Sequence, residues 1–153
     1  MPEKKTIQRA RRDAREGKAT TTQAGEFVRE EMEHIRKGKH GARSTKQAIA
    51  IGLSKARRAG VPLAPPKPGT TSERTRRQAG RALEKGPAGK RKKAAPKRSR
   101  AATNALKREG RQAASRQALS KQARGAAAAR RKRGSVTPAA KRGKSGSSRR
   151  KAA

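Results

Sequence analysis

Two histidines and a group of glutamates are the residues of this chain best suited to metal or acid–base chemistry. His34 and His40 are six residues apart, and Glu30 and Glu31 stand within about one helical turn of His34. Imidazole and carboxylate groups are common zinc ligands, but a site needs three or four of them in one place. The spacing offers no obvious third ligand, so we expect no metal site and no cofactor. We interpret the glutamates as an exposed helix face that matches the helix dipole.

Other catalytic arrangements are absent from the sequence. The glycines of GKHG, Gly38 and Gly41, do not follow a strand and so do not open a phosphate-binding βα turn. The serines have no neighbouring base that could activate them as nucleophiles. We therefore expect a protein that is not an enzyme.

The distribution of charge is the strongest functional signal. The chain of 153 residues has 45 Lys and Arg against 10 Asp and Glu, and residues 86–153 contain 23 basic residues against the single acid Glu109. Such a segment repels itself unless a polyanion neutralises it. A lipid surface is disfavoured because the segment lacks the aromatic or leucine face that interfacial helices bury. We expect DNA or RNA as the partner and no membrane.

Binding of this kind is driven by counterion release from phosphates, which carry no sequence information. Phe27 is the only aromatic residue, so base stacking on a single strand is disfavoured. The candidate phosphate contacts fall into four groups: Lys55, Arg57 and Arg58; Arg74, Arg76, Arg77 and Arg81; Lys90, Arg91, Lys92, Lys93, Lys97, Arg98 and Arg100; and Arg130, Arg131, Lys132 and Arg133.

These groups predict histone-like or nucleoid-associated DNA binding through phosphate neutralisation, with little sequence specificity. Two alternatives stay open. One is an RNA-binding or ribosome-associated factor, because such proteins also carry basic extensions. The other is a protein-interaction module whose basic tail only localises it.

The elements that position these residues are predicted to be helices. Nine of the fifteen Val, Ile, Leu, Met and Phe residues lie in 27–63. Helical spacing of Val28, Met32 and Ile35 and small residues around Gly52 predict an αα-hairpin with helices at about 22–37 and 45–59. Ser44 and Gln47 have the spacing of a capping box, and Gly38 and Gly60 suit left-handed helix ends.

The fold class is therefore all-α with extensive disorder. A hairpin buries little on its own, so its apolar stripe suggests a homodimer or a protein partner. Residues 61–63 are candidates to fold back over it. The expected organisation is a flexible basic arm at 1–19, a helical hairpin core at 20–63, a Pro-rich linker at 64–71, a short basic helix at 72–85, and a Lys/Arg/Ala-rich tail at 86–153 that is disordered or helical only when bound.

The block TQAGEFVREEMEHIRKGKHGARSTKQAIAIGLSKARRAGVPL, residues 22–63, resembles the core of a bacterial domain-of-unknown-function family of small basic proteins. The tail is similar in composition to histone H1-like bacterial proteins. The first resemblance implies a bacterial protein with an ordered core and supplies no activity. Together with the charge, it leads us to expect a cytoplasmic, nucleoid-associated protein.

Overall fold

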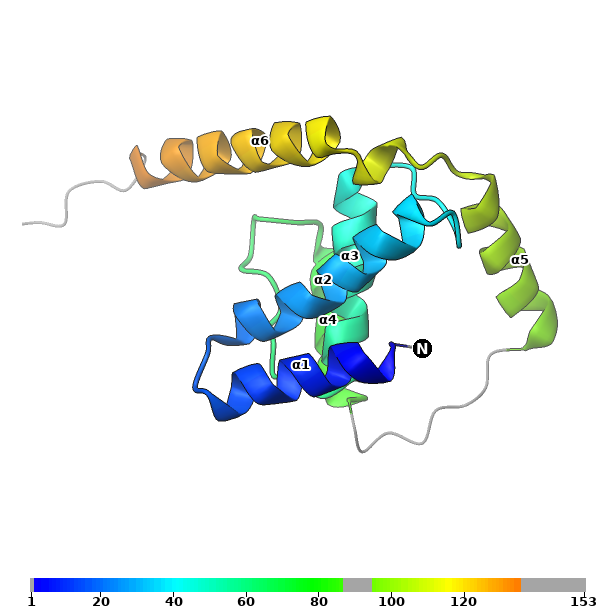
Figure 1. The fold of residues 1–153 in the computed structure, drawn as a ribbon. Helices are drawn as coiled ribbons and strands as arrows, with labels where there is room; N and C mark the ends of the chain where they lie inside the picture. Colours follow the sequence, from blue (N-terminus) through cyan, green and yellow to red (C-terminus); the bar gives the residue numbers. More distant parts are fainter. Residues whose placement is uncertain (1, 87–94, 136–153) are drawn as a thin grey trace, which may run out of the picture.

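The computed structural model describes residues 2–86 and 95–135, although not the side chains of 133–135. These residues are helical and contain no strand, which confirms the all-α class. The elements in chain order are α1 (Lys4–Arg15), α2 (Thr20–Arg36), α3 (Thr45–Arg58), α4 (Glu73–Glu84), α5 (Pro96–Arg108), the short 3₁₀ helix η1 (Gln112–Ala114) and α6 (Arg116–Ser135) (Figure 1).

The predicted hairpin is confirmed as α2 and α3. Gly38, with a φ of +71°, and Gly60, with a φ of +100°, follow the two helices in the left-handed conformation that favours glycine. Ser44 caps α3, because its Oγ accepts a hydrogen bond of 3.2 Å from the backbone N–H of Gln47. Local sequence signals thus determine where α2 ends and where α3 begins and ends.

The expected flexible arm at 1–19 is wrong, because residues 4–15 form α1 and pack against α2. Ala10 is 4% exposed and shares a core with Phe27 and Ala24 of α2. Arg9 and Glu26 form an ion pair between the two helices at 2.5 Å. The buried face of α1 has no large apolar residue besides the half-buried Ile7, so hydrophobic periodicity gave little sign of it.

The segment after α3 folds back over the hairpin, as expected. Val61 and Leu63 join Phe27 in the same core. The guanidinium of Arg57 holds this turn in place: Nε donates to the Leu63 carbonyl at 3.0 Å, and a terminal nitrogen donates to the Ala64 carbonyl at 3.2 Å. The linker then leads to α4, the predicted short basic helix, which begins at a Ser72 cap.

A second core corrects the prediction for the tail. Ala113 and Ala114 are 7% and 0% exposed and pack against Met32 and Ile35 of α2. Thr45 Oγ1 donates to the Ala113 carbonyl at 2.7 Å. Helices α5 and α6 therefore occupy much of the expected tail, and the segment around η1 belongs to the fold. Residues 87–94 and 136–153, the rest of the expected disordered tail, lie outside the described part.

The apolar stripe of the hairpin is consequently covered within one chain. Phe27 faces α1 and the 61–63 turn, whereas Met32 and Ile35 face η1. Within the described residues the stripe is therefore covered, and a homodimer or a protein partner stays a prediction from the sequence. The sequence pattern did not predict that α1 and η1 cover the stripe, because their buried residues Ala10, Ala113 and Ala114 are alanines. Alanine carries little weight in a hydrophobic pattern.

Gly52 sets the distance between α2 and α3. A Cβ on Gly52 would lie 2.7 Å from Val28 Cα, which is backbone and cannot rotate away. We expect Gly52→Ala to lower the free energy of unfolding by about 1–3 kcal/mol through overpacking, although alanine is the better helix former. Urea denaturation measures this change.

Gly25→Ala in α2 is the matched control for Gly52→Ala. A Cβ at Gly25 meets nothing within 4 Å, so we expect a gain of up to about 1 kcal/mol from helix propensity. Equal stabilisation of the two variants would contradict the close approach of α2 and α3.

Candidate nucleic-acid interface and a buried carboxylate cluster

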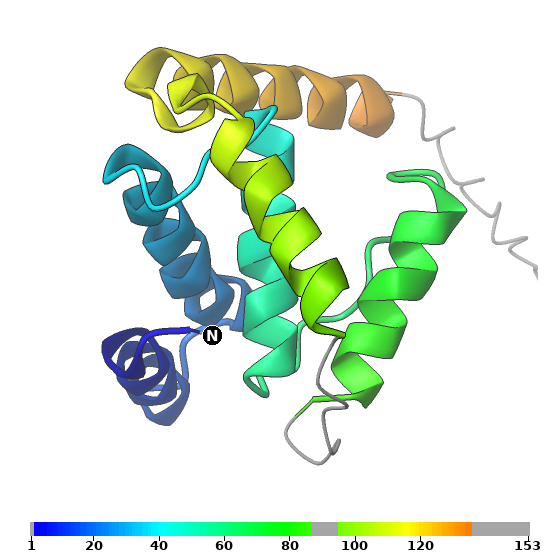
Figure 2. The ribbon, with the colours of Figure 1, turned by 90° about the vertical axis from the view of Figure 1, so that its right-hand side faces the viewer.

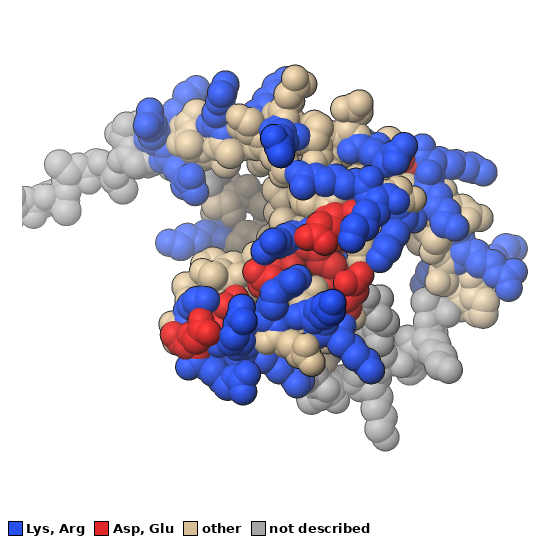
Figure 3. All heavy atoms as spheres, in the orientation of Figure 1, with Lys and Arg blue, Asp and Glu red and all other residues tan. Residues whose placement is uncertain are grey.

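Helix α6 is a long basic helix whose first turns pack against the core. It has 20 residues, and its Leu119 packs at the edge of the core around Ala113 and Ala114. Figures 1 and 2 show it crossing one end of the hairpin and extending away from α2. The residues of α6 include seven basic and no acidic side chains. In Figure 3, Lys and Arg alternate with uncharged residues along this helix, while the acidic residues form a band over α1 and α2.

A groove of about 990 Å³ lies between α6 and the start of α3. We call it the basic groove. Its cationic residues are Arg43, Lys46, Lys121 and Arg130, and none of the residues that line it is acidic. Between Lys121 and Arg130, the α6 side includes the small residues Gly125, Ala126 and Ala129, which let another backbone come close. The start of α3 adds the partial positive charge of a helix N-terminus.

A smaller pocket of about 410 Å³ adjoins the start of α6 and is lined by Arg36, Arg111 and Arg116. Arg36 is held in place because its Nε donates to the Ala114 carbonyl at 3.0 Å. Of the cations in this pocket and in the basic groove, the sequence pattern predicted only Arg130 as a phosphate contact. The others are far apart along the chain, and no local cluster marks them.

Most of the predicted phosphate contacts are exposed on three separate helices or at the end of α3. Arg76 of α4 is half-buried and pairs with Glu73 at 2.9 Å. The exposed members are Arg58, Arg74, Arg77, Arg81, Lys97, Arg98, Arg100, Arg130, Arg131 and Lys132. Lys90, Arg91, Lys92 and Lys93 lie outside the described residues, as does the side chain of Arg133.

Two predicted contacts are wrong, because Lys55 and Arg57 point into the protein. Lys55 Nζ lies 2.6 Å from Glu31 Oε2, and its side chain is 18% exposed. Arg57 is 5% exposed and clamps the turn after α3, and burial lowers the pKa of its guanidinium. These cations stabilise the fold instead of facing a ligand.

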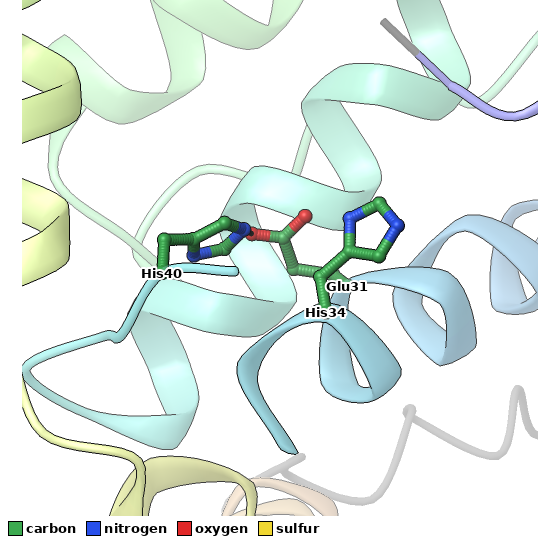
Figure 4. A group of neighbouring side chains, drawn as sticks. All are labelled: Glu31, His34 and His40. Atoms are coloured by element: carbon green, nitrogen blue, oxygen red, sulfur yellow. Dashed lines mark ion pairs between the residues drawn. The ribbon is translucent and has the colours of Figure 1, made fainter. Parts of the chain in front are cut away.

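The glutamates expected on an exposed face are buried. Glu30 and Glu31 are 3% and 0% exposed. Lys55 Nζ lies 3.6 Å from Glu30 Oε1, and His40 Nε2 lies 3.4 Å from Glu31 Oε1. Figure 4 shows the two histidines on either side of the Glu31 carboxylate. We call Glu30, Glu31, His34, His40 and Lys55 the buried carboxylate cluster.

Glu3 connects this cluster to the start of α1. Its Oε1 lies 2.9 Å from His34 Nε2 and 3.1 Å from Lys39 Nζ, and these bonds lower the pKa of Glu3 to about 2. The pKa thus falls below its ordinary value of 4.5. The interaction therefore stabilises the fold above about pH 4.5, and its contribution is lost as the pH falls towards 2.

Comparisons with protein-family models, with curated proteins and with solved structures found no match. The resemblance to a bacterial family of small basic proteins therefore stays a prediction from the sequence. Among the described residues, no helix is both long enough and apolar enough to span a bilayer.

Proposed function

We propose that this protein binds nucleic acid, with duplex DNA as the preferred partner, and does so by neutralising phosphates with little sequence preference. The observation that carries the proposal is helix α6, a basic helix without acids that leaves the protein body beside the basic groove. A nucleoid-associated, histone-like role in the cytoplasm would follow from this activity.

The dimensions of α6 suit a duplex. Its 20 residues extend over about 30 Å, and duplex DNA carries one phosphate charge per about 1.7 Å of its axis. A single helix with small residues on one side can lie along the phosphate backbone or enter a major groove. The basic groove then offers Arg43 and Lys46 to phosphates at one edge of α6.

Low sequence preference follows from the kind of side chains involved. The proposed interface is made of Lys and Arg, long and flexible side chains, on a helix that packs against the core at Leu119 near its start. Contacts to phosphates position a protein without reading bases, and base reading needs side chains held rigidly against a groove. Affinity is therefore expected to depend on salt far more than on sequence.

The test is fluorescence anisotropy of the full chain with labelled 20-bp duplexes between 50 and 200 mM salt. We expect affinity to fall by about 10³- to 10⁵-fold across this range, as for a protein that neutralises about 6–10 phosphates. Duplexes of unrelated sequence should bind within about threefold of one another. A salt dependence equivalent to fewer than about two phosphates would contradict the proposal.

Structured RNA offers the same phosphates, so it is the competitor in this experiment. At equal salt, we expect duplex DNA to displace RNA hairpins at comparable or lower concentration. Preference for RNA by more than about tenfold would replace DNA by RNA as the partner and favour a ribosome-associated role.

A further inference from the structure

Glu31, His34 and His40 form a three-residue group that the sequence did not bring together. Each offers one ligand atom, and these atoms all lie within 4.8 Å of one another. Glu31 and His34 are on α2, and His40 is in the turn before α3. In Figure 4, His40 approaches one carboxylate oxygen of Glu31, while a ring nitrogen of His34 faces the carboxylate from the other side.

The outward nitrogen of each histidine is bonded to an oxygen that can only accept. His40 Nδ1 lies 3.1 Å from the Gly41 carbonyl, and His34 Nε2 lies 2.9 Å from the ionised Glu3 carboxylate. Each of these nitrogens must therefore carry the proton. In a neutral imidazole the opposite nitrogen then bears a lone pair, and both lone pairs are directed to the Glu31 side.

The Glu31 carboxylate between the two histidines lacks hydrogen-bond partners. Glu31 is 0% exposed, and neither of its oxygens makes a hydrogen bond of acceptable geometry. Lys55 Nζ forms an ion pair with Oε2, whereas Oε1 lies 3.4 Å from His40 Nε2, the nitrogen that bears the lone pair when the imidazole is neutral. Acceptor atoms that face one another in a buried place repel unless a cation lies between them.

We propose that Glu31, His34 and His40 bind one divalent transition-metal ion of the Zn²⁺ class. Tetrahedral coordination with bonds of about 2.0–2.1 Å places ligand atoms about 3.4 Å apart, as Glu31 Oε1 and His40 Nε2 already are. The other pairs of ligand atoms are at most 4.8 Å apart. Each pair would therefore have to come closer by about 1.4 Å or less to reach the tetrahedral spacing. Water completes the coordination. This site lies beyond the nucleic-acid interface.

The surroundings match those of metal-bound histidines. A ligating histidine usually donates its second ring N–H to a carboxylate or a backbone carbonyl, which fixes the ring and its tautomer. The Glu3 carboxylate is this acceptor for His34, and the Gly41 carbonyl is this acceptor for His40. A ligand set of two imidazoles and one carboxylate favours Zn²⁺ and its neighbours over Mg²⁺ or Ca²⁺, which prefer oxygen alone.

The composition of the chain makes a sharp test possible. It has no cysteine and only these two histidines. The full chain is freed of nucleic acid and metal, and Zn²⁺ binding is measured by calorimetry at pH 7.5, with Co²⁺ absorption in the visible range as a probe of coordination. We expect one ion per chain, a visible Co²⁺ band typical of tetrahedral sites, and a thermal midpoint that rises with Zn²⁺ but not with Mg²⁺.

Substitutions assign the ligands. Glu31→Gln, His34→Gln and His40→Gln should each weaken Zn²⁺ binding by more than about tenfold, and Glu3→Gln by about 10- to 100-fold through loss of the bond to His34. Glu33→Gln is the matched control, because its carboxylate lies on the same helix and is 45% exposed. Circular dichroism in EDTA shows whether each variant folds.

Two results would overturn the proposal, and both can be obtained with folded protein. One is Zn²⁺ binding by the wild-type chain that is no tighter than binding by the His34→Gln/His40→Gln double variant. The other is a stoichiometry of one ion per two chains, which would place the metal between molecules.

Discussion

Replacing Lys121, Arg124, Arg130 and Arg131 together by glutamine is expected to weaken duplex DNA binding by about 10³-fold at 0.1 M salt. Each lost phosphate contact reduces the slope of log K against log salt by about 0.9, so four contacts reduce it by about 3 to 4. All four side chains are exposed on α6, and glutamine keeps the helix propensity. Anisotropy titrations at several salt concentrations measure both quantities.

The control removes the same charge from another face. Lys4, Lys5, Arg11 and Arg15 are exposed on α1, next to the band of acidic residues over α1 and α2. Replacing these four by glutamine also lowers the net charge from +35 to +31, that is, by four. We expect a loss of less than about tenfold. Equal losses in the two variants would show that overall charge, and not α6, determines affinity.

Lys55→Met is expected to destabilise the fold by about 3–5 kcal/mol, because it leaves buried carboxylates without their cation. Glu30 and Glu31 are 3% and 0% exposed, and the Lys55 ammonium lies within 3.6 Å of an oxygen of each. Urea denaturation at pH 7.5 in EDTA measures the change without any contribution from metal.

Two further variants test the cause of this loss. Lys46→Met removes an exposed cation from the same helix and should change stability by less than about 0.5 kcal/mol. In the double variant Lys55→Met/Glu31→Gln one of the two buried carboxylates that lost their cation is neutral, so this variant should be more stable than Lys55→Met alone. A double variant less stable than the single one would mean that the loss in Lys55→Met does not come from the unpaired Glu31 carboxylate.

The inward orientation of Lys55 could not be predicted from its neighbours in the sequence. With Arg57 and Arg58 it forms a run of cations near the end of α3, and such runs usually face solvent. Only Arg58 is exposed. Lys55 turns inward because α2 presents two buried carboxylates on the facing side, and no residue near Lys55 in the sequence indicates this.

The sequence by itself determined the helical hairpin and the excess of positive charge. The Ser44 cap, the glycines at 38 and 60 and the spacing of Val28, Met32 and Ile35 act within a few residues of one another. Signals of this range can be recognised without a fold. The basic composition of α6 is also local, so its attraction for phosphates follows from the residues alone.

The tertiary structure alone decided how α1 and η1 close the core, where α6 meets the start of α3, and how Glu31 comes to lie between two histidines and Lys55. The packing depends mainly on alanines and a threonine, and the cluster joins residues from α2, α3 and a turn. Such residues have ordinary local preferences. Their roles arise from contacts between distant segments, which a pattern along the chain does not encode.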